Sequence, residues 1–121
     1  MSINILTQLL VALVALLHVY FLALEMFLWD KGPGLRAFGH SIEQATRAKK
    51  LAMNQGLYNG FLAAGLLVGL YEGGQDGVHF QIFFLSCVIV AGVFGAITVS
   101  RKIIFIQALP ALVALVLLHL H

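Results

Sequence analysis

Four long apolar segments alternate with short polar connections along the chain. Each segment comes close to about twenty residues, the length of helix that crosses about 30 Å of hydrocarbon. The segments cover roughly residues 3–29, 51–71, 78–100 and 103–120. This pattern predicts an all-α membrane protein, in which four transmembrane helices form one bundle and a single domain over residues 1–121.

The composition agrees with this prediction. Of the 121 residues, 61% are hydrophobic and only 10% are charged. A soluble domain of this length would have too little polar surface to cover itself. The first apolar segment has neither a basic start nor a small-residue cleavage site, so we expect it to stay in the membrane rather than to be removed as a signal peptide.

The distribution of the seven basic residues predicts an orientation. None lies in the connection EGGQDG, and all lie in the connection 30–50 or directly after the third segment: Lys31, Arg36, Arg47, Lys49, Lys50, Arg101 and Lys102. By the positive-inside rule this side is cytoplasmic, and both termini lie on the outer side. We therefore expect a multi-pass protein of the bacterial cytoplasmic (inner) membrane. The net charge of +2 gives no reason to expect a nucleic-acid partner.

The long connection carries its own local signals. The sequence DKGPG is a cluster of helix breakers and predicts a turn at residues 32–34. Ser41 and Gln44 then have the spacing of a capping box, in which each side chain bonds the other residue's backbone N–H. We expect a helix to begin there and to run straight into the segment 51–71.

Polar side chains within the helices gather near the predicted cytoplasmic end. Glu25 lies about one turn from the end of the first helix, and His18 and Trp29 share its helical stripe. A charged side chain at the centre of a membrane helix costs about 3 kcal/mol, so we expect this stripe to face other helices and a cavity open toward the cytoplasmic leaflet. Burial favours a neutral carboxyl group there, whereas a nearby Arg101, Lys102 or His18 would keep it ionised, and the sequence leaves both states open.

These residues suggest a binding or catalytic site for a small apolar molecule. Glu25 would act as acid or base, and His18 would orient it or share its proton. The expected ligand-binding residues are Trp29, Asn54, Gln55, Tyr58, Asn59 and Gln107. The chemistry would be a proton transfer such as isomerisation, cyclisation or hydration, because the sequence contains no nucleophile–base triad, metal cluster or phosphate loop. We expect no metal and no cofactor, and the sequence leaves open whether a reaction takes place.

Three other interpretations stay open. Glu25 could pair with Lys49 or Lys50 and simply lock two helices together, with the amides serving as interhelical hydrogen bonds. The chain could be a proton-coupled transporter, since in size and in its helix 1 acid it resembles the small multidrug resistance exporters, although it lacks their motifs and its charge bias fixes one orientation. It could also be an accessory subunit of a larger membrane complex.

Small residues predict where helices approach closely. The segment 51–71 contains two GxxxG spacings, Gly56 with Gly60 and Gly65 with Gly69, and Gly92 with Ala96 follows in the third segment. Such spacings serve either contacts within one chain or a homodimer. The expected partners are therefore the lipid bilayer, a small hydrophobic ligand and a second copy of the chain.

The strings HVYFLALEMFLW, NQGLYNGFLAAGL, VIVAGVFGAITVSRK and QALPALVALVLL together are distinctive. With them the chain resembles a family of small bacterial membrane proteins known as domain of unknown function 1304, over almost its whole length. The resemblance implies a four-helix membrane protein and no established activity. It marks these residues: His18, Tyr20, Glu25, Trp29, Asn54, Gln55, Asn59, Arg101, Lys102, Gln107 and Pro110.

Overall fold

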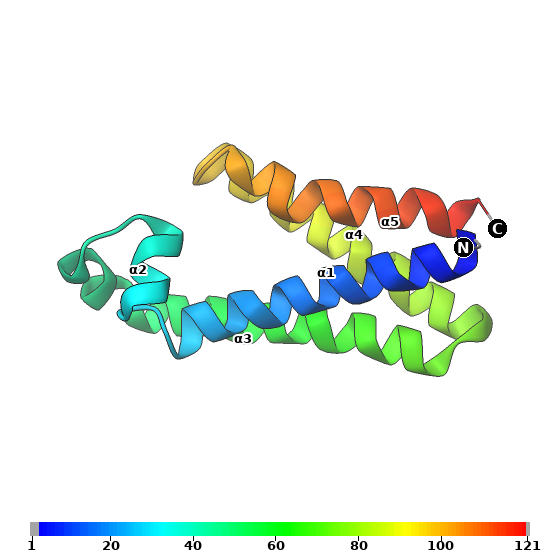
Figure 1. Ribbon diagram of the computed structural model, residues 1–121, viewed down its shortest axis with the longest axis horizontal. Helices are drawn as coiled ribbons and strands as arrows, with labels where there is room; N and C mark the ends of the chain where they lie inside the picture. Colours follow the sequence, from blue (N-terminus) through cyan, green and yellow to red (C-terminus); the bar gives the residue numbers. More distant parts are fainter. Residues whose placement is uncertain (1–2, 121) are drawn as a thin grey trace. The chain divides into compact units, whose positions relative to one another are not determined.

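The computed structural model describes residues 3–120, and that part of the chain is helical with no strand (Figure 1). The elements are α1 (Ile3–Met26), α2 (Gly32–Phe38), α3 (Ile42–Glu72), α4 (Gly74–Thr98), the π-helical turn η1 (Ile104–Ala108) and α5 (Leu109–His119). Within the described residues, α1 and α4 are long and apolar enough to cross a membrane, and η1 with α5 forms a shorter apolar helix. The all-helical class predicted from the sequence is confirmed.

Helix α3 begins at Ile42, well before the apolar segment that starts at residue 51. The cause is the capping box predicted from the sequence. The backbone N–H of Ser41 donates to Gln44 Oε1 at 2.9 Å, and the backbone N–H of Gln44 donates to Ser41 Oγ at 3.2 Å. These two bonds satisfy N–H groups that the first helical turn leaves without a partner, so the helix starts in the polar connection and continues into the apolar segment.

The expected turn at residues 32–34 is wrong. The chain turns earlier, over residues 27–31, and α2 begins at Gly32. Pro33 stands in the first turn of α2, where its fixed φ suits a helix and its missing N–H costs no bond. Gly34 is buried, and a Cβ there would clash with the backbone oxygen of Leu28, so this first turn packs directly on the preceding loop.

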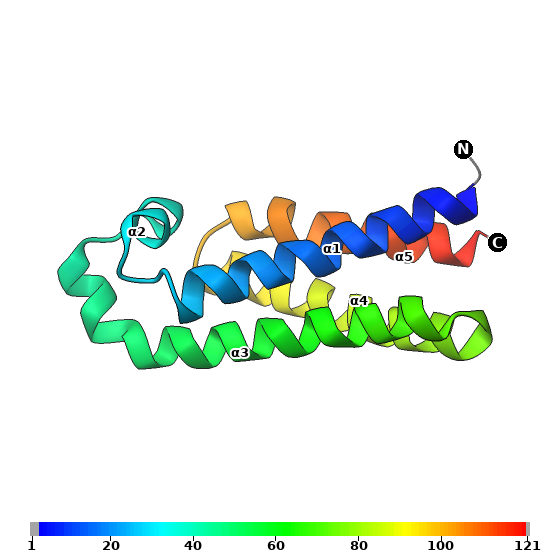
Figure 2. The same cartoon turned by 60° about the horizontal axis from the view of Figure 1, so that its bottom comes forward.

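The chain divides into two compact units. The second unit, Leu16–Phe61, holds the later part of α1, all of α2 and the earlier part of α3. Within it, α2 is set off from α3 and joined to it by a short connection after Phe38 (Figure 2). In that connection Gly39 has φ +64, a left-handed conformation that glycine adopts without steric cost, and its N–H bonds Leu35 O at 2.9 Å.

The first unit holds residues up to Ala15 and from Leu62 onward. Its apolar core is made of fully or almost fully buried side chains: Val11, Val14, Ala15, Leu66, Leu85, Val88, Ala111, Ala114 and Leu118. Helices α4 and α5 pair as a hairpin (Figure 1). Between α3 and α4 the turn is so short that Gly73 and Gly74 both have positive φ, at 63° and 58°.

The π-helical turn η1 precedes Pro110. Leu109 donates its N–H to Ile104 O, five residues back, in place of the usual four. Proline has no N–H to offer the preceding turn, and such wide turns are one way in which a helix accommodates it. Gln107, one of the predicted ligand-binding residues, lies in this turn and is partly buried.

Candidate functional site

Glu25 lies in the last turn of α1 and is partly buried. Its Oε1 accepts a hydrogen bond of 2.5 Å from Nδ2 of Asn59, which lies on α3. Both residues belong to the second unit. An acid and an amide that the sequence places 34 positions apart are therefore in direct contact.

The contact depends on glycine in α3. Gly56 is buried, and a Cβ there would lie 2.5 Å from Met26 Cγ, 3.1 Å from Glu25 Cβ and 3.2 Å from the backbone oxygen of Leu22. Glycine lets two helix backbones approach more closely than any other residue does. The close approach brings the last turn of α1 within reach of the Asn59 side chain, one turn further along α3.

One of the two lysines that the sequence suggested as a partner of Glu25 binds a different acid. Lys49 Nζ donates to Asp30 Oδ2 at 3.1 Å, and Lys31 Nζ lies 3.8 Å from Asp30 Oδ1. Neither of these two ion pairs includes Glu25 or Lys50. The carboxyl group of Glu25 is thus held by an amide and not by a lysine.

Trp29 fixes the loop that follows α1. Its Nε1–H donates to the backbone oxygen of Ala45 in α3 at 2.8 Å. Its ring also packs against Phe38 and His40, with centroids 4.8 Å and 4.4 Å away. Because an indole N–H in a partly apolar setting needs an acceptor, the bond to Ala45 both satisfies Trp29 and ties the loop to the start of α3.

Sequence reasoning did not anticipate this aromatic cluster of Trp29, Phe38 and His40, nor the role of Asp30 as the partner of Lys49. The available signal was weak. Phe38 and His40 flank Gly39, the glycine that ends the short helix α2. A left-handed glycine at a helix end changes the direction of the chain. To predict that the two rings lie beside Trp29, one would also have had to predict that a helix begins in the turn that contains Pro33.

The other predicted site residues lie in several places. His18 is fully buried, and its ring packs edge-on against Phe21 with centroids 5.2 Å apart. On α3, the side chains of Asn54, Gln55 and Tyr58 are all exposed. At about 100° per residue, Gln55 is only about 40° from Asn59 around the helix, whereas Asn54 is about 140° away.

Gln107 belongs to the first unit, and Glu25 belongs to the second. In the second unit, the structure joins Glu25 with Asn59 by a hydrogen bond and places Gln55 on the adjoining part of the α3 surface. The residues 3–120 contain no group of three or more His, Cys, Asp and Glu side chains that could hold a metal ion.

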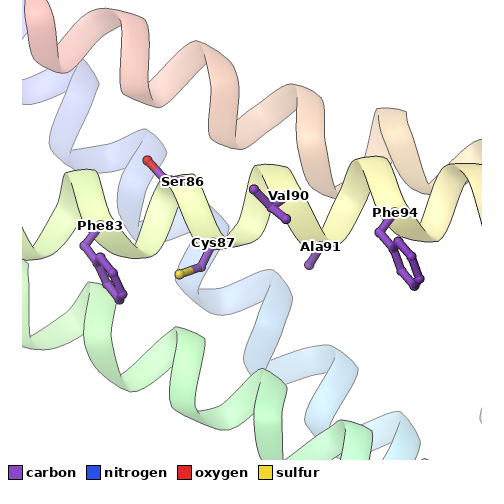
Figure 3. Close-up of a pocket in the computed structure, with 6 residues that line it drawn as sticks. All are labelled: Phe83, Ser86, Cys87, Val90, Ala91 and Phe94. Carbon is purple, nitrogen blue, oxygen red and sulfur yellow. The ribbon is translucent and has the colours of Figure 1, made fainter.

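A shallow groove follows one side of α4 in the first unit, and Phe83, Cys87 and Phe94 project from that side (Figure 3). Its lining is apolar apart from Ser86, whose hydroxyl donates to Ile82 O at 2.7 Å. A second shallow groove runs between α4 and the η1 region. Neither groove is lined by an ionisable group other than the thiol of Cys87, so they offer apolar contact without acid–base chemistry.

All four glycines of the α3 spacings are covered by the chain itself. Gly56 and Gly60 lie against α1, where a Cβ at Gly60 would be 2.7 Å from Leu22 Cδ1. Gly65 lies against the ring of Phe84, and Gly69 lies against Gly77 and Gln81, all in α4. While these contacts hold, the same glycines are not open to a second copy of the chain.

Comparison with known proteins gives a family and no activity. Residues 12–119 match the family described as "Protein of unknown function (DUF1304)". The chain is also 31% identical, over 115 residues, to "Uncharacterized protein YpaA" of Lactococcus lactis subsp. lactis (strain IL1403), an alignment that covers 93% of this chain and 96% of that protein. No solved structure gives a significant match. The protein with the Glu25–Asn59 pair is a member of the DUF1304 family.

Proposed function

We propose that the protein spans the bacterial cytoplasmic membrane with four helices and that its Glu25–Asn59 pair binds a small, largely apolar molecule near the cytoplasmic end of the bundle. The observation that carries the proposal is the hydrogen bond between Asn59 and Glu25. It joins an amide on α3 to a carboxyl group within a segment of α1 that has the length and hydropathy of a membrane span. Polar groups in such places are costly and are commonly tied to function.

The membrane placement is supported by helix length and by charge. Helices α1 and α4 have the required length and hydropathy, and the apolar parts of α3 and of η1 with α5 would supply the other two crossings. The amides at Asn54, Gln55 and Asn59 lower the mean hydropathy of α3. All basic residues fall in the two connections that this arrangement places in the cytoplasm, so both termini lie outside.

Two features favour a ligand site over a plain anchor. Lys49, which could have neutralised Glu25, is bonded to Asp30. The Asn59–Glu25 bond uses Glu25 Oε1 and Asn59 Nδ2, so Glu25 Oε2 and Asn59 Oδ1 remain as acceptors for a ligand. The pair should therefore prefer an apolar molecule that carries a hydrogen-bond donor, such as an alcohol or an amine.

Gln55 adjoins the pair on the surface of α3 and would contact the polar group of such a molecule. A carboxyl group that is bonded to a ligand can give or take a proton, so an acid–base reaction on the bound molecule is the chemistry open to Glu25. Buried His18, one of the predicted catalytic residues, lies two helical turns before Glu25 on the same stripe and would support that reaction from within α1.

The test uses three probes with the same twelve-carbon chain: dodecylamine, dodecanol and dodecanoic acid. Purified full-length protein in bilayers is titrated with each, while the infrared carboxyl bands and the unfolding temperature are followed. We expect the amine or the alcohol to change the Glu25 band and to raise the unfolding temperature by several degrees, because a ligand that binds only the folded state stabilises it. The acid should do less.

The control variants decide the assignment. Glu25→Gln keeps the shape of the side chain and should remove both responses, whereas Glu43→Gln, at an exposed carboxyl group in the first turn of α3, should keep them. Equal responses in the wild type and in Glu25→Gln, or no response to any probe, would contradict the binding site. The accessory-subunit interpretation would then be preferred.

A further inference from the structure

The outer face of α3 carries an ordered stripe of exposed side chains. Arg47, Lys50, Asn54, Tyr58 and Phe61 are all exposed. At about 100° per residue they lie within about 40° of one line along the helix. The stripe runs from two cations through an amide to two aromatic rings, and the rings are in contact with centroids 6.3 Å apart.

The opposite face of the same helix is the one that packs against the chain. Ala45, Ala52, Gly56 and Ala63 are buried and lie roughly 160–200° around the helix from Asn54. The stripe is therefore turned away from the contact with α1. In a membrane this places an amide, Asn54, on the lipid-facing side of a helix, where an unpaired polar group costs free energy.

We propose that this stripe binds one anionic phospholipid of the cytoplasmic leaflet, with its phosphate at Arg47 and Lys50, its ester region at Asn54, and an acyl chain along Tyr58 and Phe61. The inference rests on the membrane placement given under the proposed function, but it concerns a surface separate from the Glu25–Asn59 pair. The order of the side chains along α3 is the order of chemical groups along a phospholipid.

The dimensions agree with this occupant. Lys50 and Asn54 are separated by about 6 Å along the axis at about 1.5 Å per residue. The polar headgroup region on each side of a bilayer is about 5–7 Å deep. A phosphate bound at Lys50 would therefore leave the ester groups level with Asn54, and aromatic rings such as that of Tyr58 are favoured at this boundary.

Within the stripe, the charges available to a phosphate are those of Arg47 and Lys50. Neither forms an ion pair within residues 3–120, whereas Lys31 and Lys49 lie next to Asp30. Glu43 falls on the same line one turn before Arg47, farther from the apolar end, and makes no ion pair with it in the described part of the chain. The cationic part of the stripe thus faces the headgroup layer without an acid between it and the amide.

The experiment measures lipid selectivity by electron spin resonance. Full-length protein is reconstituted in phosphatidylcholine bilayers that contain a trace of spin-labelled phosphatidylglycerol or spin-labelled phosphatidylcholine. The signal of motionally restricted lipid gives the relative association of each lipid with the protein surface. We expect phosphatidylglycerol to be preferred by about fivefold or more, because each basic side chain near an anionic lipid contributes about this factor at low salt.

Two double variants test the position. Arg47→Gln with Lys50→Gln should reduce the preference to nearly one, whereas Arg101→Gln with Lys102→Gln, which removes the same charge, should keep most of it. Asn54→Leu should weaken the preference by less than the charge variant. Equal loss in both double variants, or no preference in the wild type, would overturn the lipid site while leaving the membrane placement intact. An absence of restricted lipid of either kind would overturn both.

Discussion

A methyl group added at Gly56 or at Gly60 tests the close approach of α1 and α3. The two glycines lie one turn apart on the same packed face, but their surroundings differ. At Gly56 a Cβ would meet Met26 Cγ at 2.5 Å, Glu25 Cβ at 3.1 Å and the backbone oxygen of Leu22 at 3.2 Å. At Gly60 it would meet only Leu22 Cδ1, at 2.7 Å, which is the free end of a flexible side chain.

The magnitudes follow from two opposing effects. Replacing a helical glycine by alanine gains up to about 1 kcal/mol of helix propensity at either position. Overpacking against atoms that cannot move away costs about 1–3 kcal/mol, and this cost applies to Gly56, where backbone and Cβ atoms are close. We therefore expect Gly60→Ala to be neutral or slightly stabilising and Gly56→Ala to be less stable than it by about 1–3 kcal/mol.

The assay is the free energy of unfolding of the full-length protein in mixed detergent micelles, obtained from circular dichroism as sodium dodecyl sulfate is added. Because Glu25 Cβ is one of the atoms displaced, Gly56→Ala should also change the infrared carboxyl signal of Glu25, and Gly60→Ala should not. Equal stability of the two variants would refute the argument, since it would mean that the backbones at Gly56 are farther apart than the structure has them.

Two further predictions concern the polar connection. Ser41→Ala removes the hydroxyl that accepts the Gln44 N–H and should cost about 1 kcal/mol of stability; hydrogen exchange should quicken in the first turn of α3, and unchanged exchange there would argue against the cap. The hydrogen bond from Lys49 lowers the pKa of Asp30 below its ordinary value of 3.8. Because the pKa of Asp30 is lower in the folded state, its carboxylate stabilises the fold at pH values above the ordinary pKa. This stabilisation is lost as the pH falls through the lowered pKa of the folded state. The midpoint of unfolding, measured at a series of pH values, should therefore fall more steeply toward low pH in the wild type than in Asp30→Asn. Parallel curves of midpoint against pH would contradict the Lys49–Asp30 bond.

The residues of the candidate site could be predicted only in part from the sequence. Glu25 stands out because an acid in an apolar helix is costly wherever it faces, and this inference needs no partner. Its partner could not be identified in the same way, because four polar side chains within residues 54–59 had similar sequence surroundings. The position of Gly56 against Glu25 and Met26 fixes the rotation of α3, and this rotation brings Asn59 to Glu25 and turns Asn54 away.

The connection between α1 and α3 shows the same division between local and tertiary information. The capping box at Ser41 was readable because its hydrogen bonds join residues three apart, within one turn of helix. The turn predicted at residues 32–34 is wrong because glycine and proline are typical of turns, whereas proline also suits the first turn of a helix. The deciding contact, the packing of Gly34 on Leu28, lies outside local sequence rules.

The sequence by itself determined the helical class, the apolar segments, the connections in which the basic residues gather and the presence of a carboxyl group in an apolar helix. These properties depend on composition and on spacing within one element, which are local quantities. Only the tertiary structure decided that Lys49 binds Asp30, that Asn59 binds Glu25, and that the remaining polar residues of α3 face outward. Each of these depends on how closely and at what rotation two distant segments pack, and that is set by the shapes of both surfaces together.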